Sequence, residues 1–187
     1  MHIINSQKGT LYIADTMVNE NPDTDALVDI ARLAATSVRF FNEKPVVAMI
    51  SHSNFGSDNT EGTLKVRRAV ARLQQEDPSM LIDGELQIGS ALNKEMRDNM
   101  YPFNKLYGED VNTLVFPNLT SARSSYKMLQ AMNSDVEIIG PIQMGLNKPI
   151  HFIDFGSSVR EVVNITAVAV IDAYVDKVKG RITAQMK

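Results

Sequence analysis

VVAMI at residues 46–50 is followed by the polar loop SHSNFGS at residues 51–57, a helical pattern over about 61–75 and a second apolar run at 80–82. Five consecutive apolar residues suit a strand that is buried on both faces, as in parallel sheets. A strand, a helix and another strand joined by short connectors predict a right-handed crossover in which the helix covers one face of the sheet. This stretch therefore predicts an α/β fold.

The same alternation extends in both directions from this unit. Other short apolar runs that are typical of strands lie at residues 11–14, 111–116, 136–139 and 150–153. Helical patterns follow the capping sequence NPDT at 21–24 and occupy residues 88–100, 120–132 and about 159–182. Strands and helices in this order predict a doubly wound, mainly parallel sheet between layers of helices.

The last helix has a well-marked start. Ser158 and Glu161 have the spacing of a capping box, in which each residue binds the backbone N–H of the other. The helix carries a wide apolar face, so it needs a large surface to pack against. Turn-forming residues are concentrated at 140–149, which we predict to be the weakest boundary in the chain.

Composition excludes several classes of protein. The chain has 187 residues, 44% hydrophobic and 22% charged, as in an ordinary globular protein. A formal charge of −3 without a Lys/Arg run argues against nucleic acid as a partner, and the absence of cysteine excludes disulfides and thiolate sites. We see neither an apolar run of about 18 residues nor a signal-peptide pattern, so we expect a cytoplasmic protein without a membrane partner.

The loop at residues 51–57 is the first candidate site. Ligands of open α/β sheets bind beyond the carboxyl ends of strands, where hydroxyls and helix N-terminal amides can hold phosphate. The loop matches neither of the glycine-rich phosphate motifs, so a solvated connector is the other interpretation. His52 could serve as a general base, but the sequence shows no nucleophile or orienting carboxylate beside it, which favours a polar loop residue.

Charged residues elsewhere are also ambiguous. Asp83 and Glu85 flank Gly84, which would permit close approach of another backbone or a ligand, and could do acid–base work; pairing with a cation or capping a helix is the favoured alternative. Lys148 could bind a phosphate. The histidines do not have metal-ligand spacing, so we expect no metal site.

An ordered set of motifs resembles a known family. The motifs are NP at 21–22, S-x-S-x-x-GS at 51–57, DGELQ at 83–87, FPN at 116–118, GPI at 140–142, GLNKP at 145–149 and SV at 158–159. Together they are similar to the second half of phosphate acetyl/butyryltransferases, over nearly the whole chain. The resemblance implies the phosphotransacetylase-like fold of the isocitrate dehydrogenase-like superfamily, a three-layer α/β/α arrangement with two lobes. Residues 1–142 would form the second lobe and residues 143–187 would return to the first lobe, whose remainder would lie outside this sequence.

The loop SHSNFGS, with VN at 163–164 and AVAV at 167–170, resembles more closely the domain that ends large bacterial NADP-dependent malic enzymes. This resemblance implies a regulatory and oligomerising module of a longer chain. Acetyl-CoA or a related acyl-CoA would be its effector, and its partners would be further copies of itself and the malic-enzyme domains of the same chain. NADP and a divalent metal would bind in that remaining part.

The resemblance also places the site residues. Where the transferases carry Ser-Arg, this chain has Asp154 and Phe155, which would neither attack an acyl group nor neutralise a phosphate. Glu161 aligns with the catalytic carboxylate of the family, so the resemblance implies three degenerate positions and no catalytic residue. The residues expected to line the cleft are Ser51, Ser53, Asn54, Gly56, Ser57 and Lys148. A fragment of an active phosphate acyltransferase, and a scaffold that only joins subunits, remain as alternatives.

Overall fold

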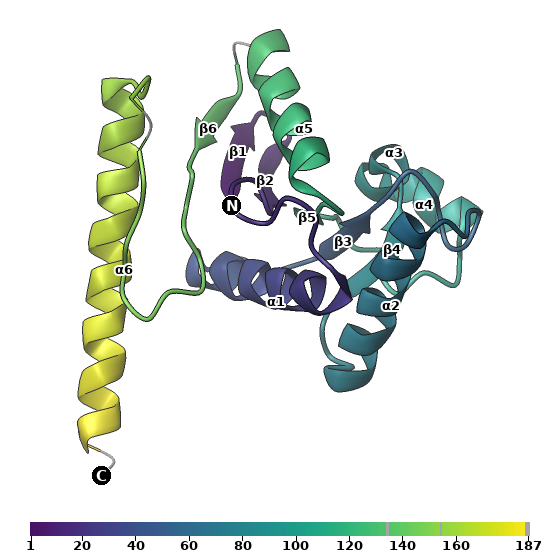
Figure 1. Ribbon diagram of the computed structural model, residues 1–187, viewed down its shortest axis with the longest axis horizontal. Helices are drawn as coiled ribbons and strands as arrows, with labels where there is room; N and C mark the ends of the chain where they lie inside the picture. Colours follow the sequence, from purple (N-terminus) through teal and green to yellow (C-terminus); the bar gives the residue numbers. More distant parts are fainter. Residues whose placement is uncertain (134, 154, 186–187) are drawn as a thin grey trace.

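A single six-stranded sheet organises the molecule (Figure 1). The computed structural model describes residues 1–133, 135–153 and 155–185. Strands β2, β5, β3 and β4 run parallel to one another, whereas β1 is antiparallel to both β2 and β6. The strand order is β4-β3-β5-β2-β1-β6, with β1 at His2–Ser6, β2 at Gly9–Ala14, β3 at Val47–Ile50, β4 at Ile82–Leu86, β5 at Thr113–Val115 and β6 at Glu137–Ile139. The predicted α/β fold with a mainly parallel sheet is confirmed.

Helices cover both faces of this sheet. The apolar run of β3 serves both cores, because Val47 and Met49 pack with α1 and α2 while Ala48 and Ile50 pack with α3 and α5. The predicted two-sided burial of this strand is therefore confirmed. The helices are α1 at Thr24–Phe40, α2 at Glu61–Glu76, α3 at Ile88–Leu92, α4 at Lys94–Met100, α5 at Leu119–Met132 and α6 at Val159–Gln185.

The sequence prediction failed at two strands. Residues 150–153 were expected to form a strand, but they run as an irregular connector in which Ile150, Phe152 and Ile153 are exposed. The first strand, β1, was not predicted. It pairs with β6 through Ile3 and Ile139, and so extends the sheet by two antiparallel strands.

The helix predicted at residues 88–100 is two helices. Asn93 separates α3 from α4, and its side-chain oxygen accepts a hydrogen bond from the backbone N–H of Met96 at 3.0 Å. A side chain that caps a helix start in this way satisfies one of the first N–H groups, which have no partner within the helix. The chain therefore changes direction at Asn93.

Arg97 of α4 holds the long loop that follows it. Its side chain is 0% exposed, and its guanidinium donates hydrogen bonds to the carbonyl oxygens of Leu106 at 2.8 Å, Glu109 at 2.7 Å and Ala91 at 3.3 Å. Asp98 supplies the opposite charge at 3.0 Å. A buried charge is tolerated only when it is paired and hydrogen-bonded, and this one is both.

The start of α6 agrees with the sequence. Ser158 donates its backbone N–H to the Glu161 carboxylate at 2.6 Å, and Glu161 donates its own to the Ser158 hydroxyl at 3.2 Å, which confirms the capping box. Ile165 and Val168 join the core on the α1 and α2 side of the sheet. Figure 1 shows α6 at the margin of the molecule, beyond β6. Among the described residues, no helix is long and apolar enough to cross a membrane.

Candidate functional site

The polar loop at residues 51–58 lies between the end of β3 and the start of α2, and β4 fixes its path. Ser51 donates its backbone N–H to the carbonyl of Leu86, and Phe55 donates its N–H to the carbonyl of Glu85, both at 2.9 Å. The chain turns at Phe55 and Gly56, which have φ values of 43° and 90°. Gly56 suits that left-handed backbone because it has no Cβ.

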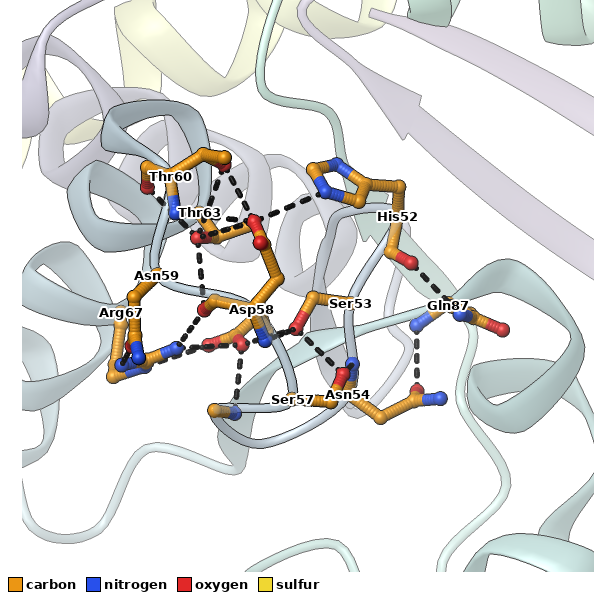
Figure 2. Close-up of polar contacts among 12 residues, drawn as sticks. His52, Ser53, Asn54, Ser57, Asp58, Asn59, Thr60, Thr63, Arg67 and Gln87 are labelled. Atoms are coloured by element: carbon orange, nitrogen blue, oxygen red, sulfur yellow. Dashed lines mark hydrogen bonds and ion pairs between the residues drawn. The ribbon is translucent and has the colours of Figure 1, made fainter.

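Ser53 lies at the centre of the loop (Figure 2), where it contacts Glu85 of β4. Ser53 is 1% exposed, and its hydroxyl donates to the Glu85 carboxylate at 2.9 Å. The same hydroxyl lies 2.9 Å from the Ser57 hydroxyl and accepts the backbone N–H of Asp58 at 3.1 Å. The Ser53 oxygen is therefore held by three neighbours.

Glu85 is completely buried and remains an ionised acceptor. Its carboxylate accepts the N–H of Gly56 at 2.8 Å and two hydrogen bonds from Arg67 of α2, at 3.0 and 3.1 Å. Burial opposes ionisation, but the Arg67 guanidinium and the Gly56 N–H outweigh it and lower the pKa of the Glu85 carboxyl below its usual value. Arg67, which sequence reasoning missed, is therefore the cation that neutralises this carboxylate.

His52 has a carboxylate partner that the sequence did not reveal. Its Nε2 lies 3.2 Å from the Asp58 carboxylate, although the His52 side chain is largely exposed. Hydrogen bonds from the Thr60 hydroxyl and N–H hold the pKa of Asp58 at about 2, so this carboxylate is ionised at neutral pH. A spacing of six residues across an irregular loop gives no periodic signal, which is why the pair was missed.

The outer part of the loop is also anchored. Asn54 accepts the N–H of Gln87 at 2.8 Å, and Gln87 donates its side-chain amide to the carbonyl of His52 at 2.7 Å. Gly56 and Ser57 are exposed, so they remain accessible at the rim of a fixed loop. A preformed loop of this kind suits ligand binding more than nucleophilic catalysis. The Ser53 hydroxyl donates to a carboxylate that Arg67 already neutralises, so it is not activated as a nucleophile.

Asp83 and Glu85 do not act on one shared group. β4 contains a bulge after Gly84, since Met49 pairs with Gly84 and Ile50 pairs with Leu86. Asp83 therefore takes other partners, the N–H groups of Lys105 at 2.6 Å and Gly84 at 2.9 Å, and burial raises the pKa of its carboxyl.

Gly84 permits the close approach that the sequence suggested. It has a φ of 148°, and a Cβ at this position would lie 2.6 Å from the Met49 carbonyl oxygen. For Glu85 the interpretation as a carboxylate paired with a cation is the one found, because Arg67 binds it.

Lys148 does not join the loop. It lies on the connector between β6 and α6 and lines a cavity with Arg39 at the end of α1. Figure 1 shows this connector beside the C-terminal end of α1, while α2, which follows the loop, is at the other end of that helix. Of the degenerate positions, Phe155 is fully exposed, Glu161 caps α6, and Asp154 lies outside the described residues.

Comparisons with known proteins agree with this architecture. A family model described as "Phosphate acetyl/butaryl transferase" matches residues 1–170. The NADP-dependent malic enzyme of Salmonella typhimurium is 42% identical over 165 residues, 88% of this chain and 22% of that enzyme. The phosphate acetyltransferase of Clostridium acetobutylicum is 38% identical over 168 residues, 89% of this chain and 50% of that enzyme.

Solved structures give the same relationship. The EutD phosphotransacetylase from Staphylococcus aureus superposes with a TM-score of 0.83 and 31% identity, covering 94% of this chain and 53% of that one. A phosphotransacetylase from Streptococcus pyogenes gives a TM-score of 0.83 and 32% identity, covering 94% of this chain and 52% of its own. The chain thus spans about a fifth of the malic enzymes and about half of the transferases that it matches.

Proposed function

The chain belongs to the phosphate acetyl/butyryltransferase family, and from this premise we propose that it is the regulatory and oligomerising domain of a cytoplasmic NADP-dependent malic enzyme. In this proposal the domain binds acetyl-CoA or a related acyl-CoA without transferring the acyl group. The parent decarboxylates malate to pyruvate, and its NADP and divalent metal bind in the rest of the polypeptide.

One observation carries the proposal more than any other. The similarity to malic enzymes covers 88% of the chain at 38–42% identity in three bacteria, and it matches their C-terminal part. The transferase pattern is lost at Asp154 and Phe155, where the resemblance places a Ser-Arg pair. Inside the loop, the Ser53 hydroxyl donates its hydrogen bond to Glu85, so the loop offers no activated group for a reaction with a thiol or phosphate.

Binding by the loop follows from its fixed geometry. Glu85 and Arg67 hold its inner side, and Gly56 and Ser57 face solvent at its rim. A loop that is already ordered loses little entropy when a ligand binds. Regulation additionally requires that the ligand bind two global states of the parent unequally.

The test is malate-dependent NADPH formation by the full-length parent with and without acetyl-CoA. The proposal expects acetyl-CoA to change the rate of the intact enzyme and to leave unchanged an enzyme that ends before this domain. Ser57→Ala should weaken the response, whereas Ser79→Ala, which also removes a hydroxyl from a hydrogen-bonded turn, should not. A parent that never reduces NADP would instead favour an acyltransferase. An equal response of the truncated and intact enzymes would show that the acetyl-CoA sensor lies outside this domain.

Subunit association is supported by the apolar surface of α6. Val159, Val163, Val170 and Tyr174 are all exposed on this helix. Apolar surfaces of this kind mark contacts with other proteins. Light scattering of the parent should show a smaller assembly for the double variant Val163→Lys with Val170→Lys. An unchanged molar mass would show that α6 does not form the subunit interface.

A further inference from the structure

Three aromatic side chains form a cluster at the loop of residues 51–58. Phe55 belongs to the loop, and Tyr101 and Phe103 belong to the segment that follows α4. The ring centroid of Phe55 lies 5.0 Å from that of Tyr101 and 5.1 Å from that of Phe103. These separations, with tilted or edge-to-face ring planes, are typical of favourable aromatic pairs. The cluster therefore joins the loop to a distant segment of the chain, and the acyl-CoA contacts proposed above do not use it.

Phe103 is the exposed member of this aromatic cluster. It is 71% exposed, whereas the other two rings are half-buried. The backbone beside it is fixed, because the Asn104 side chain donates to the carbonyl of Tyr101 at 2.7 Å. The backbone N–H of Lys105 donates to the Asp83 carboxylate at 2.6 Å. Phe103 therefore presents aromatic surface at a defined position beside the loop.

The position of the cluster selects one end of the proposed ligand. Phe55 directly precedes Gly56 and Ser57, which are exposed at the rim of the loop, so a ligand that binds along this rim would lie next to the cluster. An acyl chain is stabilised most by complete burial, which a largely exposed ring does not provide. A purine is different, because it can stack with one face on an aromatic ring while its phosphates stay in water. Phe103 thus suits the nucleotide end of an acyl-CoA.

We propose that the purine ring of an acyl-CoA stacks on Phe103 when the ligand binds at this loop. Phe55 and Tyr101 hold the Phe103 ring in place through their own ring contacts, and the remainder of the ligand follows the rim at Gly56 and Ser57. This inference rests on the proposed function, because it requires an acyl-CoA at the loop. It adds that the domain recognises the nucleotide as well as the acyl thioester.

Binding of two ligands to the intact protein tests the inference. Acetyl-CoA carries the purine, whereas acetyl-4′-phosphopantetheine has the same thioester and lacks the adenosine. In calorimetry, Phe103→Ala should raise the Kd for acetyl-CoA about 10-fold, as expected for the loss of one stacked base, and leave the Kd for acetyl-4′-phosphopantetheine unchanged. Phe103→Tyr should keep the wild-type affinity, because it retains an aromatic face. Tyr107→Ala is the matched control, since it removes a 62% exposed ring from the same segment and should change neither Kd.

Thermal unfolding checks that Phe103→Ala folds. If it does not, Phe103→Leu takes its place, because leucine keeps apolar packing against Phe55 without an aromatic face. An unchanged Kd for acetyl-CoA, or an equal loss of affinity for both ligands, would overturn the stacking and leave the proposed function in place. A smaller assembly in light scattering with unchanged affinity would instead assign Phe103 to a contact between subunits. Failure of the wild-type protein to bind acetyl-CoA would overturn both proposals.

Discussion

The loop at residues 51–58 and the connector with α6 differ in how their polar and apolar groups are satisfied. At the loop, the Glu85 carboxylate accepts hydrogen bonds from the Ser53 hydroxyl, from Arg67 and from the backbone N–H of Gly56. Along the connector and α6, the buried side chain of His151 makes no hydrogen bond to a described residue, and several large apolar side chains face solvent. The first region is determined by its own residues. The second region has the composition of a surface that binds another molecule.

The largest expected effect tests the first half of this comparison. Glu85→Gln should lower the free energy of unfolding by about 3 kcal/mol, because it leaves Arg67 and the Gly56 N–H without a buried anion. Urea unfolding measures the change. Glu61→Gln removes an exposed carboxylate that pairs with Arg68 and should cost less than about 1 kcal/mol. Equal losses in the two variants would mean that the loop does not depend on its buried ion pair.

A pH effect of similar size tests whether the region of buried, hydrogen-bonded polar groups includes His2. His2 is buried against Tyr126, bonded to Thr16 at 2.8 Å, and burial lowers its pKa to about 3. Its pKa in the unfolded chain is about 6.5, so the unfolded state binds more protons between these values and stability falls as pH falls. Between pH 7 and pH 4 the loss from His2 should be about 3 kcal/mol.

The check is the pH dependence of urea unfolding in the wild type and in His2→Gln. The variant should lose stability less steeply between pH 7 and pH 4, because Gln does not titrate. Parallel curves for the two proteins would show that His2 is accessible to protons in the folded state.

A smaller effect compares a buried and an exposed residue of α6. Ile165 is 5% exposed and Val163 is 59% exposed on the same helix. Ile165→Ala should cost about 2 kcal/mol, near the low end for a buried aliphatic residue because α6 makes few contacts, and Val163→Ala should cost less than about 0.5 kcal/mol. Urea unfolding compares the two. A similar cost for both would show that α6 is not docked by Ile165.

The smallest effect concerns the start of α6. Ser158→Ala removes one half of the capping box and should cost about 1 kcal/mol or less, because the site is exposed. Amide hydrogen exchange should become faster in the first turn of α6 and stay unchanged in α2. Unchanged exchange at Glu161 would show that its N–H does not need the Ser158 hydroxyl.

Sequence alone was sufficient for the features that depend on local pattern. The consecutive apolar residues of β3, the Asp23 cap of α1 and the capping box of α6 each act within a few positions of the chain. The strand expected at residues 150–153 failed because a short apolar run has no period that separates a strand from an exposed connector. The order of motifs across the whole chain identified the family, although no single motif did.

The candidate site was less predictable, because its contacts join distant positions. Arg67 and Glu85 are 18 residues apart, and neither a helix nor a strand pattern relates them. The loop residues were expected beside Lys148, yet the irregular path of residues 140–151 carries that lysine to the end of α1. The degenerate position Asp154 lies outside the described residues, so its expected place near the cleft stays a prediction.

Arg97 has a consequence for the loop that it holds. Phe103 and Tyr107 are 71% and 62% exposed, but the segment that carries them is bound through the carbonyl groups of Leu106 and Glu109. Because the backbone that carries these two rings is anchored, it has little conformational entropy left to lose on binding. Any protein surface that meets them would therefore encounter a preorganised contact at a low entropic cost.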